Sequence, residues 1–557
     1  MPLLDAAGSR AKRAIWLGVI LVLVPSGCTR DEAKTQLPSD DTDSLQVRAL
    51  SDMRDAPSLS RSDQFVPPAA EFPPIPQDPV AQEKARQTRY QQQRMEFQRA
   101  YLRFGRRNIL WDATVSEALE HFAKFQASPA YRESSETNGW YWNRLEEVGD
   151  DQYRAWKAAR RALEAGCNDP LIQYLFARLS YGECAVEYGV AGQYWALAAE
   201  GMSQSDYPPY FKALAFIRAG DFIARQNFNR RTESNPEAER WIEQALALLP
   251  AVARDYEGKP DKSVVLYHFG ALLVEAHRLL PGRSLESAHR IVAAALSRSA
   301  SCRVAELLLT ADSELRIAWL RRGRATADQV TADNWDLFDS RLDRADDALI
   351  AAAELEPNCP EIPHLMIFVE TYLDRGRDRM EHWFERAMQL NGDDYFACLA
   401  KLEYLEPRWH GSEAEMLGFG RACLRTKNTE GRLPFILLEA HHRLARNAVP
   451  PNASISRESD YFTRPYVWKD IQAIYEPLLA KHPDSTYDKS CYARFATLTG
   501  HSELANRLFE ELGTNYWRSA FRGTEYLVLR EAARQGKLPQ PQLYRRERRM
   551  VDPPRPE

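Results

Sequence analysis

The sequence has little that would build a β-sheet. No sustained run of β-branched residues alternates with polar ones, and no Asn-Gly or Asp-Gly pair joins two such runs. Stretches with helical spacing recur instead, divided by brief stops. Within LEAGCNDPLIQYL (residues 163–175), Gly166 suits the end of one helix, while Asp169 and Pro170 suit the start of the next. The sequence therefore predicts an all-α fold of helix hairpins.

Signatures of common catalytic sites are absent as well. The chain contains no HExxH zinc-hydrolase motif, no GxSxG serine-hydrolase motif, no P-loop and no dinucleotide-binding glycine motif. His441 and His442 are adjacent, so on a helix their side chains point about 100° apart and chelate a metal poorly. Acidic pairs such as Asp393–Asp394 are expected to cap helices or face solvent. We therefore predict no enzyme activity, no metal site and no cofactor.

Neither sign of charge dominates the chain. Its 557 residues include 73 Lys and Arg against 78 Asp and Glu, a formal net charge of −5. So small a net charge gives the molecule no strong field toward nucleic acid. We therefore expect no nucleic-acid partner.

Cysteines are few and scattered. No CxxC motif or Cys/His cluster with metal-ligand spacing occurs among them. Apart from Cys28, they are Cys167, Cys184, Cys302, Cys359, Cys398, Cys423 and Cys491. Most lie in apolar helical stretches, where cysteine behaves as a small buried hydrophobe. Cys398 and Cys423 could form a disulfide, which the sequence leaves open.

What the sequence does contain begins with an export signal. Basic residues at 10–13 precede the apolar stretch AIWLGVILVLV (14–24), and the small residues Ser26 and Gly27 precede Cys28. At about 1.5 Å per residue, an eleven-residue helix is too short to span a ~30 Å bilayer core. The segment resembles a bacterial lipoprotein signal, which implies cleavage after residue 27 and acylation of Cys28. The resemblance predicts a lipid-anchored, periplasm-facing protein of the cell envelope.

Two features bear on how this signal is used. Pro25 stands where lipoprotein signals usually carry an aliphatic residue. An ordinary signal peptide with an incidental Cys28 and an uncleaved anchor are therefore alternative interpretations. Thr29 follows the cysteine in place of Asp, which in the lipoprotein family favours the outer membrane over the inner one.

Composition divides the rest of the chain into three parts. Residues 28–80 are rich in Pro and Ser and low in hydrophobicity, which predicts a disordered tether. Residues 81–540 carry the helical pattern and form the body, with a possible break between two lobes near 325–340. Residues 541–557 are a basic, Pro-rich tail.

The first helical stretch, residues 81–107, has one apolar face and many cations. Tyr90, Phe97, Tyr101 and Phe104 recur at helical spacing and predict the buried face. Eight basic residues lie between Lys84 and Arg107. We expect them to form a solvated face, with contact to anionic headgroups as the alternative.

Residues 355–391 form the best internal repeat. The segment starts at LEP and ends at LNG, and Leu355 lies 35 residues before Leu390. Its characteristic positions are Tyr372 in the first helix, Gly376 at the turn, and Phe384 and Ala387 in the second helix. This pattern resembles a degenerate tetratricopeptide repeat, whose period is about 34.

Two further segments repeat the pattern. In residues 492–512, Gly500 marks the turn, Ser502 is expected to cap the second helix, and Ala505 and Phe509 take packing positions. A weaker copy lies at 154–170. Together these units predict an α-solenoid of stacked antiparallel helix pairs along most of 110–540.

A distinctive turn lies in LEYLEPRWHGSEAEMLGFGRAC, residues 402–423. Residues 360–515 around it resemble a poorly characterised family of bacterial helical-repeat proteins, which implies a fold but no activity. The turn predicts a loop at 407–412, with Ser412 capping the next helix and Glu415 completing a capping box. Arg408, Trp409 and His410 lie on this loop. We expect Trp409 to pack on the body, and these three residues are the alternative candidates for contacting a partner.

The sequence as a whole predicts a membrane-tethered scaffold that binds a protein or peptide. One alternative is an envelope hydrolase or lyase acting on cell-wall glycan, which would need paired carboxylates with separated pKa values. The other is a structural spacer within an envelope complex.

Overall fold

The computed structural model describes most of the predicted body. It describes residues 71–128, 150–181, 188–226, 235–323, 329–447, 461–517, 519–521 and 525–537. Within these ranges every regular element is a helix, which confirms the all-α prediction. Cys28, the signal segment, most of the predicted tether and the basic tail lie outside the described residues.

The helices of the described ranges follow one another along the chain in this order. They are α3 (Pro79–Phe104), α4 (Asp112–Ala127), α5 (Asp150–Glu164), α6 (Pro170–Tyr181), α7 (Tyr188–Ser203), α8 (Pro209–Gln226), α9 (Pro236–Asp255), α10 (Lys262–Arg278), α11 (Leu285–Leu296), α12 (Arg303–Arg322), α13 (Ala332–Leu355), α14 (Glu361–Leu373), α15 (Arg377–Leu390), α16 (Tyr395–Tyr404), α17 (Glu413–Arg425), α18 (Phe435–Asn447), α20 (Pro465–Lys481), α21 (Thr486–Leu498), α22 (Ser502–Leu512) and α23 (Glu525–Arg534). Short 3₁₀ turns cover Ala300–Cys302 and Ser519–Phe521.

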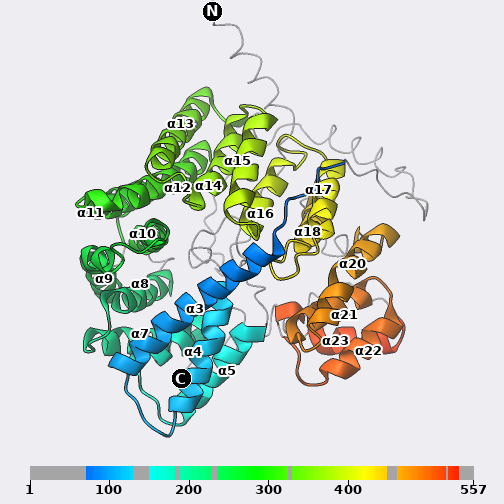
Figure 1. The fold of residues 1–557 in the computed structure, drawn as a ribbon, viewed down its shortest axis with the longest axis horizontal. Coiled ribbons are helices and arrows are strands. Elements are labelled where there is room, and N and C mark those ends of the chain that lie inside the picture. The colour runs from blue at the N-terminus through cyan, green and yellow to red at the C-terminus, as the bar shows by residue number, and fades with distance from the viewer. Residues whose placement is uncertain are drawn as a thin grey trace, which may run out of the picture.

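Neighbouring helices pack in pairs, and the pairs stand side by side in a ring (Figure 1). The helices α8, α10, α12, α14, α16 and α18 each pack on the next of this set as well, and they lie nearer the centre than their partners. We call these six the inner layer. Across the predicted lobe break, α12 and α13 pack against each other.

Burial differs from helix to helix. All ten residues of α16 are buried, although they include Lys401 and Glu403. Among the other helices, α22 buries one face with Ala505 and Leu508 on a strongly amphipathic pattern, whereas α6 is buried from residue 170 to 180. The ring therefore has polar groups inside its packed layer as well as on its surface.

The predicted turns are built by local chemistry. Gly166, Gly376 and Gly500 all adopt positive φ, which glycine allows without strain. Asp169 accepts a hydrogen bond from the backbone N–H of Leu171 at the start of α6, as predicted. The expected cap at Ser502 is wrong, because α22 begins at Ser502 and its N-cap is His501, without a side-chain bond.

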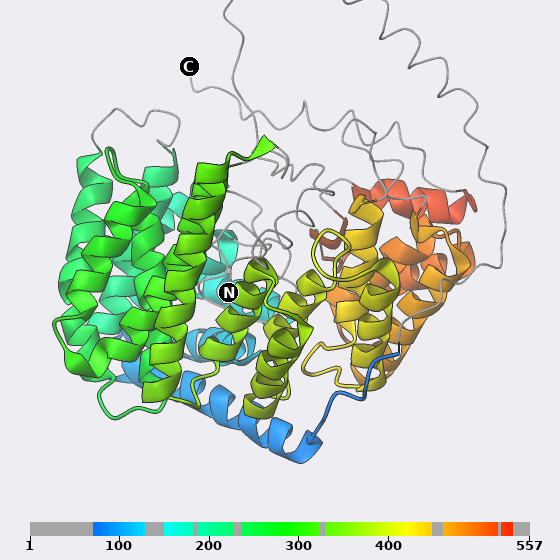
Figure 2. The same ribbon diagram turned by 90° about the horizontal axis from the view of Figure 1, so that it is seen from above.

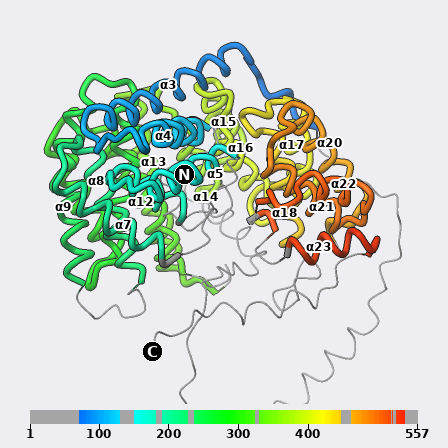
Figure 3. Tube along the Cα trace, turned by 90° about the horizontal axis from the view of Figure 1, so that it is seen from below, coloured from blue at the N-terminus to red at the C-terminus, as the bar shows by residue number. Residues whose placement is uncertain are grey.

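The first helix, α3, departs from the ring order. It lies along one face of the ring (Figure 2) and runs from α15 to α4 (Figure 3). Its C-terminal half buries Phe97 between Phe122 of α4 and Phe211 of α8, with ring centroids 5.2 and 5.1 Å away. Because α3 joins distant parts of the ring, we call it the strut.

The ring closes where α5 meets α21. The Asp150 carboxylate accepts hydrogen bonds from the backbone N–H groups of Thr486 and Tyr487, at 2.8 and 3.1 Å. The first N–H groups of a helix have no partner within it, so Asp150 satisfies donors that α21 leaves open. Tyr153 packs edge-on against Trp517, with ring centroids 5.2 Å apart. Burial raises the pKa of Asp150, while the two backbone bonds oppose this shift.

Replacing this carboxylate should open the closure. We expect Asp150→Ala to lower the free energy of unfolding by about 1–2 kcal/mol, as for other lost helix caps. Hydrogen exchange at Thr486 and Tyr487 should accelerate. Asp151→Ala is the matched control, because Asp151 bonds only the half-buried His121 beside it. Equal effects of the two variants on exchange in α21 would contradict the closure.

Candidate functional site

Six ionisable side chains from three successive inner-layer helices form one cluster. We call it the inner charge cluster: His268 and Glu275 from α10, Asp312 and Arg316 from α12, and Glu361 and His364 from α14. Helices α10 and α14 pack on α12 from either side, and one side-chain contact joins them directly. His268 Nε2 makes that contact, 3.4 Å from Glu361 Oε1.

Arg316 is the central cation of the cluster. Its guanidinium contacts the carboxylate of Glu275, and Nη1 lies 3.7 Å from Asp312 Oδ2. Glu275 is fully buried and also receives Arg278 at 2.7 Å. A buried charge is tolerated only when it is paired, so these two arginines offset the cost of burying the Glu275 carboxylate inside the layer.

Burial changes the acid–base behaviour of the cluster. It raises the pKa of Asp312 to about 7, with a further contribution from the nearby charge of Glu361. Arg316 does not reverse this shift, because its guanidinium is already engaged by Glu275. Burial also lowers the pKa of Arg316 to about 10. Asp312 can therefore hold a proton near neutral pH and donate a hydrogen bond.

Other kinds of site find little support in the described ranges. No group of three or more His, Cys, Asp or Glu side chains is placed to hold a metal ion there. Nor does any described helix have the length and apolar character needed to cross a bilayer. The six cysteines in this part of the chain are free and buried, and the pKa of Cys398 is raised by burial and by its hydrogen bond with Cys423.

The predicted loop at 407–412 packs on the body. The Trp409 ring lies 5.1 Å from that of Tyr372 and 5.8 Å from that of Trp319. His410 Nε2 lies 2.7 Å from the carbonyl oxygen of Thr371, and Arg408 pairs with Glu406 at 2.8 Å. Trp409 and His410 thus hold the loop on α12 and α14, while Arg408 pairs two residues away in the chain, and the role of all three in binding a partner stays a prediction.

The start of the helix after this loop agrees with its sequence pattern in part. Ser412 Oγ accepts a hydrogen bond from the backbone N–H of Glu415, as expected for a cap. The Glu415 carboxylate accepts from the Ser412 hydroxyl and from Arg377, rather than completing the reciprocal backbone bond.

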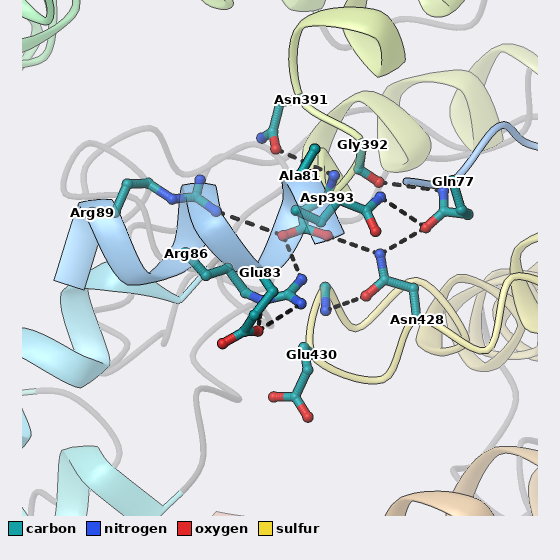
Figure 4. Close-up of polar contacts among 12 residues, drawn as sticks. Gln77, Ala81, Glu83, Arg86, Arg89, Asn391, Gly392, Asp393, Asn428 and Glu430 are labelled. Atoms are coloured by element: carbon teal, nitrogen blue, oxygen red, sulfur yellow. Dashed lines mark hydrogen bonds and ion pairs between the residues drawn. The ribbon is translucent and has the colours of Figure 1, made fainter. Parts of the chain in front are cut away.

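The strut docks on the ring through Asp393, in the turn between α15 and α16 (Figure 4). The side chain of Asp393 is 1% exposed, and its Oδ2 lies 2.7 Å from Arg86 Nη1 and 3.7 Å from Arg89 Nη2 of α3. Asn428, from the α17–α18 loop, donates to Asp393 Oδ1 at 2.8 Å. A Cβ on Gly392 would lie 2.3 Å from Gln82 Nε2, so glycine permits this approach.

The segment before α3 adds an aromatic anchor. Phe72 packs on Phe419 of α17, with centroids 5.7 Å apart, and Lys401 Nζ lies 5.4 Å from its ring. Gln77 accepts a hydrogen bond from Asn428 and donates to the carbonyl of Gly392. Residues 71–78, the last part of the predicted tether before α3, therefore lie against the ring.

Sequence reasoning did not identify these strut contacts. Asp393–Asp394 was expected to cap a helix or face solvent, and only Asp394 caps α16, by accepting from Ala397 N–H. Asp393 instead binds a helix 307 residues away. The many basic residues of α3 indicate that acidic partners are required. The sequence does not show which acidic residues these partners are.

Comparisons with known proteins add no functional assignment. No family model matches the chain, and no curated protein matches it either.

The inner charge cluster predicts a specific pH dependence. The pKa of Asp312 is about 7 in the folded protein, against about 3.9 in an unfolded chain. Its stabilising contribution is therefore complete below about pH 4 and is lost as the pH rises toward 7. We expect wild type to lose up to about 4 kcal/mol of unfolding free energy across this window, and Asp312→Asn to lose less.

Urea unfolding between these pH values measures this difference. Asp347→Asn, at an exposed position on α13, is the matched control and should follow wild type. Identical pH profiles for Asp312→Asn and wild type would show that Asp312 is not protonated in the folded state.

The strut site predicts a large effect of one carboxylate. Asp393→Ala should lower the free energy of unfolding by about 3–5 kcal/mol, because Arg86 and Asn428 lose a buried acceptor. Glu83→Ala removes a half-exposed partner of the same arginine and should cost less than about 1 kcal/mol. Chemical denaturation gives both values, and hydrogen exchange over residues 79–90 should rise only in the Asp393 variant. A small effect in both would mean that α3 does not depend on this contact.

Proposed function

We propose that this protein is a lipid-tethered scaffold of the bacterial cell envelope that binds a protein or peptide on the inner layer of its ring. The supporting observation is the inner charge cluster, in which the side chains of His268 and Arg316 are 17% and 13% exposed while the three carboxylates and His364 are buried and hold them in place. Polar and charged groups of this kind fix the register of a polypeptide partner through directional hydrogen bonds.

The charge of the chain favours a polypeptide over a nucleic acid as the partner. A nucleic-acid surface needs a predominance of cations, whereas this chain has a formal net charge of −5. The helix pair α14–α15 also agrees with a tetratricopeptide-like unit, with Gly376 at its turn and Ala387 buried in its second helix. Stacked units of this class commonly present extended binding surfaces on the inner side.

The tether part of the proposal depends on the sequence around Cys28. The predicted lipid would be joined through residues 29–70 to the segment at 71–78, which lies against the ring and continues into α3. A membrane anchor at Cys28 would therefore pull first on the contact between Phe72 and the ring, and then on the strut.

The enzyme alternative has one observation in its favour. Asp312 and Glu361 are neighbouring carboxyl groups, and the pKa of Asp312 is raised to about 7, as a catalytic acid requires. A catalytic acid must also touch its substrate, whereas Asp312 is only 8% exposed and faces Arg316. We therefore favour binding over glycan cleavage.

Site-specific photocrosslinking in the native envelope tests the proposal. A photoreactive amino acid replaces His268 in the inner charge cluster or, as the control, Ile350, which is 42% exposed on the outer helix α13. We expect the position-268 protein to form a discrete crosslinked product that the position-350 protein lacks. Products at neither position would argue for the structural spacer, and products at 350 alone would place the partner on the outer surface.

The tether is tested on the same full-length protein. Wild type should carry the added mass of acyl chains and fractionate with membranes, and Cys28→Ser should lose the added mass. An unmodified wild type would refute the lipid anchor and leave the crosslinking result to be judged by itself.

A further inference from the structure

We propose that the outward face of α3 and the turn after it form a docking surface for anionic lipid headgroups. We call this surface the α3 outer face and define it by Val80, Lys84, Met95, Arg99, Leu102, Arg103, Ile109 and Leu110. The inference deepens the proposed membrane tethering by assigning the part of the folded body that meets the bilayer.

Exposed apolar side chains concentrate on this face. Val80 is 80% exposed, Met95 40%, Leu102 55%, Ile109 93% and Leu110 70%. These are five of the eleven large hydrophobic side chains that are exposed in the described ranges, and they fall within 31 consecutive residues. Scattered exposed hydrophobics need no explanation, whereas a concentration of them indicates an interaction surface.

Helical spacing puts these residues on one side of α3. Residues 80, 84, 91, 95, 99 and 102 follow one another at steps of three, four or seven, which makes a single stripe. Phe97 and Tyr101, on the opposite side, are buried in the ring. Because the residues of the stripe are exposed while Phe97 and Tyr101 are buried, the stripe faces away from the helices on which α3 packs.

The turn after α3 presents its apolar side chains in a fixed geometry. Trp111 Nε1 donates to the carbonyl of Arg106 at 3.0 Å, and Asn108 Oδ1 accepts from the backbone N–H of Leu110. Arg106 N–H donates to the buried Asp169 carboxylate at 2.7 Å. Ile109 and Leu110 are therefore held outward on a turn that is bonded to the ring.

The charge of the segment selects the partner. Between Val80 and Leu110 there are eight basic residues and two acidic ones, Glu96 and Glu83, of which Glu83 pairs with Arg86. The carboxylate of Glu96 accepts a hydrogen bond from Tyr256 at 2.7 Å, on the ring side of α3. Lys84, Arg99 and Arg103 are exposed beside the apolar residues. The α3 outer face therefore combines apolar side chains with cations and has little negative charge to oppose an anion.

A bilayer surface fits this combination better than a protein partner does. Phosphate groups and acyl chains lie next to each other at the bilayer interface, so cations and short apolar side chains along one line are both satisfied there. The cores of protein interfaces, in contrast, are enriched in aromatic residues, and the α3 outer face has none. The stripe along 26 residues of α3, about 39 Å long, is suited to lie flat on such a surface.

Thiol labelling of Ile109→Cys in the full-length chain tests the proposal. The chain also carries Cys28→Ser, so that no attached lipid contributes, and the cysteines of the described ranges are buried. The probes are vesicles of phosphatidylcholine alone and vesicles that also contain phosphatidylglycerol. We expect the anionic vesicles to slow labelling at position 109 by about tenfold or more, and the zwitterionic vesicles to slow it far less.

Three controls make the test specific. Leu527→Cys, at a position that is 67% exposed on α23, should label equally in both vesicles. The parent chain without an added cysteine gives the background. Arg99→Glu with Arg103→Glu should abolish the protection at 109, while Arg298→Glu, at an exposed position after α11, should leave it intact.

The outcomes separate this inference from the tether. Equal labelling with both vesicles, whether fast or slow, would overturn it, because the apolar segment at 14–24 is present in every sample. Protection that rises with protein concentration in the absence of vesicles would overturn it in favour of a second copy of the chain. Since every sample carries Ser at position 28, failure of the lipid anchor leaves this result unaffected.

Discussion

The buried carboxylate of Asp393 is the contact on which the position of α3 depends. A charge that is 1% exposed is stable only with partners close by, and Arg86 of α3 and Asn428 provide them. The other half of α3 is fixed by apolar packing of Phe97 on α4 and α8. One helix is thus fixed by a polar contact near its N-terminus and by aromatic packing in its C-terminal half. It connects parts of the ring that are far apart in the sequence.

Closure of the ring also depends on a carboxylate that bonds a segment far away in the sequence. Asp150 is a half-buried carboxylate whose partners also lie far away in the chain, and it satisfies backbone donors that α21 cannot satisfy itself. Stacked helix pairs normally contact only their neighbours, so an open array can bend at each interface. The closure and the strut add two contacts of long sequence separation, which restrict that bending and hold the inner layer in one arrangement.

The sequence predicted what is decided locally. Gly166 and Asp169 define a helix end and a helix start by their own backbone preferences, and Gly376 does the same between α14 and α15. The strut and the closure could not be predicted in this way. Asp393 and Asp394 are adjacent and chemically identical, yet one binds α3 over 307 residues and the other caps α16. Likewise, Asp150 accepts a hydrogen bond from the distant Thr486, whereas its neighbour Asp151 pairs with His121. Which acid of each pair turns inward is decided by tertiary packing, and a single sequence contains no record of that packing.

The two sides of α3 connect the proposals to each other. Its inner side braces the ring through Arg86 and Phe97, and its outer side carries Met95, Leu102 and the cations proposed to meet lipid. Docking of the α3 outer face would lay that face of the ring on the bilayer, with the helix pairs standing away from it. A partner bound to the inner layer and a lipid surface bound to α3 would then contact different helices. Any coupling between the two would pass through the contacts of Asp393 and Phe97, because the two ligands share no contact residue.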